Sequence, residues 1–258
     1  MTISQQLGRL INANATLWAG EAEVARTYWD SPVRTHETDL LWLARQCRKE
    51  LCGGFLRHFA QLASEFNEND RGIDRHEALE LAEIAFEELS HYCILADVYD
   101  ALCQDTEPLL DTKTVKEQAD WPENTALSQL RAEHWSRGRL GQRAYAITEG
   151  GYCAVFAEGM KLKGRGGADD LIAEACAKIY DDEFDHMLRG IIGLEKAGLG
   201  EGDWTMLTEM TVAQMKQRIR MRNAQFSRPL KEARVEEILA GEIEPVAFDY
   251  ERAGLLSH

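Results

Sequence analysis

Two short segments of this chain repeat one arrangement of side chains that could bind metal ions. The segments FEELSHY, at 86–92, and YDDEFDHM, at 180–187, each contain an acidic residue, then a glutamate and, three positions later, a histidine. Residues three positions apart lie on one face of a helix, so each glutamate would point the same way as its histidine. A carboxylate beside an imidazole suits iron or manganese. The residues are Glu87, Glu88 and His91 in the first segment and Asp182, Glu183 and His186 in the second.

Chance is a poor explanation for this repetition. With 44 acidic residues and 7 histidines in 258 positions, the composition gives only about 0.1 copies of the pattern. One glutamate–histidine pair cannot fill the coordination sphere of a metal ion. Two pairs that face each other could hold two ions, provided that other helices supply bridging carboxylates.

The spacing of apolar residues predicts helices along nearly the whole chain. Five prolines interrupt it, and the sequence lacks strand-like alternation bounded by hairpin turns. We therefore expect an all-α protein with a single domain, 1–258, made of a leading helix in 1–34, a bundle in 35–197, and an extra helix and tail in 198–258. The expected helices cover about 3–29, 35–66, 74–103, 125–163, 169–197 and 203–227.

Hairpin geometry indicates which glutamates could face the two motifs. In an antiparallel pair of helices, residues equally distant from the connecting loop lie at the same height. Reflecting Glu88 about the expected loop near 69–70 leads to a position beside Glu50. Reflecting Glu183 about the expected loop near 166 leads to Glu149. A glutamate is therefore present where each hairpin requires one.

The sequence leaves alternatives to these assignments open. Rival glutamates are Glu65 and Glu68 in the first hairpin and Glu158 in the second. The two in the first hairpin lie at a helix end, too far from the height of Glu88. A second ligand set would use Glu87 and Asp182 in place of Glu88 and Glu183, because residues four positions apart also share a helix face.

The ligand candidates resemble those of the ferritin-like carboxylate di-iron proteins. In that superfamily, two helices supply one glutamate each and two supply Glu-x-x-His. The resemblance covers about 35–197 and implies a ferritin-like four-helix bundle with additional N- and C-terminal helices. It also implies two iron ions as cofactors, with manganese as the other metal that such ligands accept, and dioxygen as co-substrate. The implied metal ligands are Glu50, Glu88, His91, Glu149, Glu183 and His186.

The acidic residue before each motif glutamate resembles that of the di-iron oxygenases and the ribonucleotide reductase small subunits, where it hydrogen-bonds a ligand imidazole. Carried over, the resemblance implies that Glu87 holds His186 and that Asp182 holds His91. Such partners fix the tautomer of the imidazole and raise its basicity. Where many of those oxygenases have an arginine before the histidine, this chain has different residues, Ser90 and Asp185.

Several residues near the expected ligands have two interpretations each. The glycine pairs could leave open space for dioxygen or a substrate, or could permit close packing of helices. These pairs are Gly53-Gly54 and Gly150-Gly151. Tyr152 could carry electrons or a radical, or could pack in a bundle core. We expect the arginines of the last long helix to form a solvated or docking face; they are Arg218, Arg220 and Arg222.

Three functions are consistent with this resemblance. The first is a non-haem di-iron oxygenase or oxidase that uses dioxygen to oxidise a small organic molecule. The second is a ferritin-like iron-storage protein, and the third is a radical-generating protein similar to the ribonucleotide reductase small subunits. The helices outside the expected bundle favour the enzyme, because storage ferritins need little beyond four main helices.

The bulk composition limits the kinds of partner. A net charge of −15 repels phosphate backbones, so we expect no nucleic acid partner. The sequence has no apolar run of about 20 residues and no signal-like start, so we expect no membrane partner and a cytoplasmic location. Its six cysteines form no C-x-x-C pair and are expected to be reduced thiols. The expected partners are a small-molecule substrate, an electron-donor protein and a second copy in a homodimer.

Overall fold

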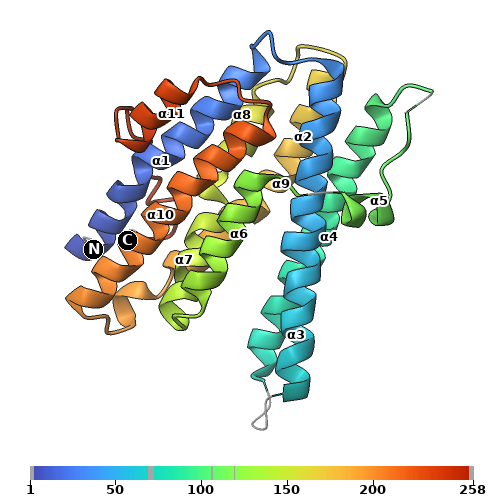
Figure 1. Ribbon diagram of the computed structural model, residues 1–258. Coiled ribbons are helices and arrows are strands. Elements are labelled where there is room, and N and C mark those ends of the chain that lie inside the picture. Colours follow the sequence, from blue (N-terminus) through green and yellow to red (C-terminus); the bar gives the residue numbers. More distant parts are fainter. Residues whose placement is uncertain (1–2, 69–72, 106, 119, 256–258) are drawn as a thin grey trace. The chain divides into compact units, whose positions relative to one another are not determined.

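The computed structural model describes residues 3–68, 73–105, 107–118 and 120–255 (Figure 1). Within these ranges every regular element is a helix, which confirms the all-α class. The long helices pack side by side, as in a helical bundle. The arms 36–68 and 75–102 are antiparallel, whereas the helices 5–29 and 201–225 are parallel, because Asn14 bonds to Thr211 and Glu21 to Arg218. None of the helices in these ranges combines the length and the apolar character that crossing a membrane requires.

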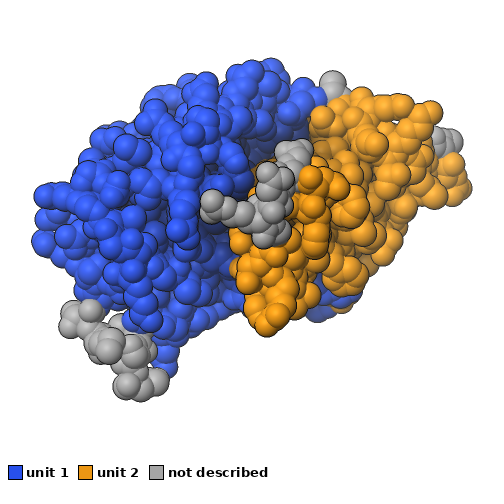
Figure 2. Space-filling model, turned by 90° about the horizontal axis from the view of Figure 1, so that it is seen from below, with its two compact units in different colours: residues 1–34, 120–163, 176–258 blue, residues 35–119, 164–175 orange. Residues whose placement is uncertain are grey.

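The chain divides into two compact units, coloured separately in Figure 2. Unit 1 consists of 1–34, 120–163 and 176–258, and unit 2 consists of 35–119 and 164–175. One helix, α9 (Ala168–Ile191), contributes its first residues to unit 2 and the rest to unit 1. The single domain expected for 1–258 stays a prediction.

Unit 2 is built around the helical hairpin expected from the sequence. Its first arm is α2 (His36–Arg48), the π-helical segment η1 (Lys49–Phe55) and α3 (Leu56–Glu68), which follow one another without a break. Its second arm is α4 (Arg75–Leu102), which packs against all three. A short helix, α5 (Thr112–Glu117), packs on α2 and η1. The loop expected near 69–70 lies outside the described residues.

Capping residues define where the two arms begin. Thr35 and Thr38 form a capping box at the start of α2. The Asp74 carboxylate accepts hydrogen bonds from the backbone N–H groups of His76 and Glu77, at 2.8 and 3.3 Å. These bonds satisfy N–H groups that have no partner within the helix. The start of the second arm at Asp74, expected from the sequence, is therefore confirmed.

Unit 1 is organised around two long helices, α1 (Gln5–Trp29) and α10 (Glu201–Gln225), which pack along each other. The leading helix and the last long helix expected from the sequence are thus confirmed. Two shorter helices, α6 (Pro122–Trp135) and α7 (Arg139–Glu149), pack on α10. Two others, α8 (Ala154–Met160) and α11 (Glu232–Leu239), pack on α1.

The single helix expected over 125–163 is wrong. The chain leaves the helical path after Trp135, where Gly138 has φ +71°. It leaves again after Glu149, where Gly151, Tyr152 and Cys153 all have φ between +55° and +57°. Left-handed residues cannot continue a right-handed helix. The helix expected over 169–197 also ends early, at Ile191, followed by Gly193 with φ +79°.

Candidate metal centre

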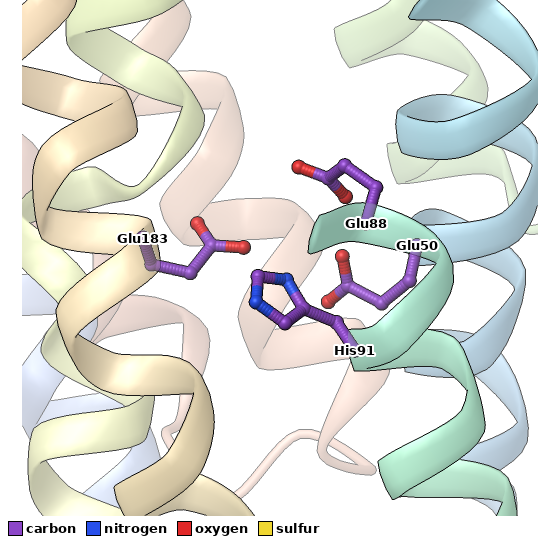
Figure 3. Close-up of side chains that lie close together, drawn as sticks. All are labelled: Glu50, Glu88, His91 and Glu183. Carbon is purple, nitrogen blue, oxygen red and sulfur yellow. The ribbon is translucent and has the colours of Figure 1, made fainter. Parts of the chain in front are cut away.

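Unit 2 brings together three of the expected ligands, Glu50, Glu88 and His91 (Figure 3). Each offers one ligand atom, and these atoms all lie within 4.8 Å of one another. The side chains are buried, with exposed fractions of 4%, 2% and 0%. Carboxylates are rarely buried unless they are paired or bind a metal. A buried cluster of two carboxylates and an imidazole therefore marks a site that could hold a metal ion.

The backbone at Glu50 has an unusual form. Glu50 lies in the seven-residue π-helix η1, between two α-helices of the same arm. π-helical turns are rare and occur frequently at functional sites. The Gln46 side chain, one turn earlier and also buried, donates a hydrogen bond to Glu50 Oε1. Gln46 was not expected from the sequence, although its position four residues before Glu50 puts it on the same helix face.

Gly54 permits the close approach of the two arms at the cluster. A Cβ atom added to Gly54 would lie 2.0 Å from Glu88 Oε2, whereas one added to Gly53 would meet no atom within 4 Å. Gly54 is buried and Gly53 is exposed. The packing interpretation of this glycine pair therefore holds for Gly54, and the open-space interpretation does not.

The electrostatics of the cluster favour a bound cation. Two carboxylates held close together away from water repel each other, and a divalent ion neutralises both. Burial, and then the negative charge of Glu50, raise the pKa of the nearby Cys47 thiol well above its usual value. Burial also raises the pKa of Tyr92, the residue after His91, to about 12. The carboxylate and imidazole donors fit iron or manganese.

Unit 1 contains the other three expected ligands. Glu183 and His186 are buried on one face of α9, and Glu149 is the partly exposed last residue of α7. Figure 3 also draws Glu183. Among the residues that the structure describes, Glu149 and His186 do not belong to a group of three or more ligand atoms with this close spacing. Their role as ligands stays a prediction.

Gly150 sets the distance between the end of α7 and α9 within unit 1. A Cβ atom added to Gly150 would lie 2.6 Å from the backbone oxygen of Glu183. The residue after Glu149 is therefore pressed against the backbone of Glu183. This glycine, like Gly54, serves close packing and does not leave open space.

The rival ligand Glu158 has other partners. It is buried in α8, where its Oε1 atom lies 2.8 Å from Lys161 Nζ and 3.4 Å from Arg26 Nη1. Two cations beside one carboxylate oxygen compete with a metal ion for it. These ion pairs favour Glu149 over Glu158 as the ligand from this part of the chain. Likewise, Glu88 is more deeply buried than Glu87, which favours Glu88 in the first motif.

A buried ion-pair cluster holds the backbone of Glu149, and sequence reasoning missed it. Arg218 Nε lies 2.9 Å from both carboxylate oxygens of Glu21, and Arg222 Nε lies 2.7 Å from one of them. Arg218 Nη1 donates to the backbone oxygen of Glu149 at 2.5 Å. Arg218 and Arg222 have exposed fractions of 2% and 1%. The prediction that Arg218 and Arg222 form a solvated or docking face is therefore wrong. They can be buried because the carboxylate of Glu21 in α1 compensates their charges.

Glu21 stays ionised in this cluster. Burial by itself would raise its pKa, but the charges of Arg218 and Arg222, with their hydrogen bonds, lower it below the ordinary value. Gly151 lies against the same cluster, since an added Cβ atom would lie 2.1 Å from Glu21 Oε2. Gly151 also has φ +55°, a conformation that glycine adopts readily.

Tyr152 is used for packing. Its ring stacks on Trp18, with 5.1 Å between the ring centroids. Its hydroxyl group donates to the backbone oxygen of Ala247 at 3.2 Å and accepts from the backbone N–H of Asp249 at 3.0 Å. Both contacts favour the packing interpretation over electron transfer. The roles expected for Glu87 and Asp182 as partners of the imidazoles stay predictions, and both side chains are partly buried.

Compared with protein-family models, with curated proteins and with solved structures, the chain has no match.

Proposed function

We propose that this protein is a non-haem di-metal oxidoreductase that uses dioxygen to oxidise a small organic molecule. The observation that carries the proposal is the buried set of Glu50, Glu88 and His91, two carboxylates and an imidazole converging beside a π-helix. This donor set suits iron first and manganese second. The doubled motif in the sequence extends the proposal from one metal ion to two.

The proposed ligands are those implied by the resemblance of the two motifs to the ferritin-like di-iron proteins. Glu50, Glu88 and His91 would hold one ion, and Glu149, Glu183 and His186 would hold the second. Two iron ions would supply the electrons that reduce dioxygen. The chain's own residues would orient the ligands: Gln46 holds one oxygen of Glu50, and Gly54 leaves room for the Glu88 carboxylate.

Burial supports chemistry away from bulk water. The three side chains of the cluster are at most 4% exposed, so a species formed there would meet little solvent. A site of this kind would let a bound molecule be oxidised with little competing reaction with water. The carboxylates would also be available to accept a proton from a bound substrate or water.

Metal analysis of the reconstituted protein tests the proposal. Apo-protein is loaded anaerobically with ferrous iron, desalted and assayed for bound metal. We expect about two ions per chain, with a loss of metal in Glu88→Ala. The matched control is Glu83→Gln, which changes an exposed carboxylate on the same helix and should keep both ions. Wild-type protein without bound iron or manganese would overturn the proposal.

Excess ferrous iron with dioxygen distinguishes the enzyme from iron storage. We expect oxidation to saturate near two irons per chain while the protein stays a small oligomer. Continued oxidation of many irons per chain, with a mineral-filled particle, would support storage instead. A product that requires dioxygen, a reductant and intact Glu88 would identify the substrate class.

A further inference from the structure

The chain is held in an unfavourable conformation immediately after Glu149. Two of the three consecutive left-handed residues there, Tyr152 and Cys153, are not glycines. Such residues are unfavourable in this conformation and persist only where the surroundings fix them. The Glu21–Arg218 pair holds the start of the break through the backbone oxygen of Glu149. A second segment contacts the break at Tyr152.

That segment is 246–252, which we call the C-terminal strap. Its Ala247 oxygen and Asp249 N–H both bond to the Tyr152 hydroxyl, at 3.2 and 3.0 Å. The Phe248 ring packs on Tyr152, with 5.4 Å between ring centroids, and on Trp18, with 5.9 Å. The Val246 N–H donates to the backbone oxygen of Ala15 in α1, at 3.2 Å.

The strap also holds α9 on either side of Glu183. Arg252 donates to the Tyr180 hydroxyl at 2.9 Å and to Asp181 Oδ1 at 2.6 Å. The same guanidinium lies over the ring of Phe184, 4.0 Å from the centroid. Arg252 therefore contacts the residues just before and just after the pair Asp182-Glu183.

We propose that the C-terminal strap positions Glu149 and Glu183, with Tyr152 and Arg252 as its positioning residues. This inference rests on the proposed function, because it concerns two of the proposed ligands. The strap contacts the break after one ligand and the helix turn that carries the other. Metal binding and strap docking are then coupled, and each strengthens the other.

Cobalt(II) is the probe that tests the strap, because its visible spectrum reports ligand geometry as well as occupancy. Residues that orient ligands typically contribute 10–100-fold to metal affinity. We expect Arg252→Gln and Tyr152→Phe each to weaken cobalt binding by roughly 10-fold and to change the visible spectrum. Arg252→Lys keeps the charge beside Asp181 and should recover part of the affinity.

Two controls separate positioning from general stability. Arg220→Gln removes exposed ion pairs with Glu232 and Glu236 in the same unit and should leave affinity and spectrum unchanged. The thermal midpoint of each apo-variant shows whether it is folded. In wild-type protein, cobalt should also slow hydrogen exchange at the Asp249 amide.

The outcomes are distinct. Wild-type affinity and spectrum in both Arg252→Gln and Tyr152→Phe would overturn the strap proposal and leave the metal centre standing. A lower thermal midpoint with an unchanged spectrum would also overturn it, since the strap would then be structural only. Wild-type protein that binds no cobalt, iron or manganese would overturn the proposed metal centre itself.

Discussion

Gly54 and Glu88 lie in direct contact where the two arms of the unit 2 hairpin meet. A Cβ atom on residue 54 would overlap the Glu88 carboxylate, with 2.0, 2.6 and 2.9 Å to its Oε2, Cδ and Cγ atoms. Distances below 3.0 Å require a shift of the side chain. The position of a proposed ligand is thus set by the absence of a side chain on the facing helix.

We predict that Gly54→Ala weakens manganese binding by about 10-fold or more, because Glu88 must move to make room. Isothermal titration of the apo-protein measures this. Gly53→Ala is the matched control, since it adds the same methyl group one residue away in open space and should bind as wild type does. Equal affinities in the two variants would show that the Glu88 position does not matter for binding.

We predict that Glu149→Ala loses one metal ion per chain and that Glu158→Ala keeps both. The reason is that Glu158 is already paired with Lys161 and Arg26, while Glu149 lies beside Gly150, which packs on Glu183. Metal analysis after desalting measures both variants. If Glu158→Ala loses an ion while Glu149→Ala retains two, the ligand from this part of unit 1 is Glu158.

We predict that Glu21→Gln lowers the free energy of unfolding by about 3–5 kcal/mol, because it leaves two buried arginines without a compensating charge. Urea denaturation at pH 7 measures it. The matched control is Glu23→Gln on the same helix, whose partner Arg234 is 33% exposed, so its loss should cost about 0–1 kcal/mol. Similar losses in both variants would contradict a special role for the buried cluster.

The pH dependence of this effect has a definite sign. The pKa of Glu21 is lowered in the folded protein from an ordinary value of 4.5. Its contribution to stability is therefore fully present above pH 4.5 and is lost as the pH falls through the lower folded-state pKa. The difference between wild type and Glu21→Gln should shrink on acidification below pH 4.5. A difference that grows there would mean that Glu21 is protonated in the folded state.

The first hairpin could be predicted from the sequence because its helices run without interruption. Counting residues from the loop gives the height of a residue only if every residue in both arms advances by the same distance along the helix axis. The arms 36–68 and 75–102 come close to that condition, so the reflection of Glu88 led to the neighbourhood of Glu50. The π-helical form of the turn at Glu50 has no signal of its own in the sequence.

The second half of the site could not be predicted in the same way. The chain breaks between 150 and 153, so counting residues back from the loop near 166 does not measure height along one helix. Gly150 and Gly151 gave the local signal for that break. The buried Glu21–Arg218 pair depends on a contact between α1 and α10, residues 197 apart in sequence, and local patterns carry no information about it.

The position of bound metal tests the central claim most directly. Crystals loaded with manganese are measured at its absorption edge, where anomalous scattering locates each ion. We predict two peaks per chain, one beside Glu50, Glu88 and His91 and the other beside Glu149, Glu183 and His186. Manganese bound elsewhere, or no peak beside Glu50, Glu88 and His91, would contradict the account.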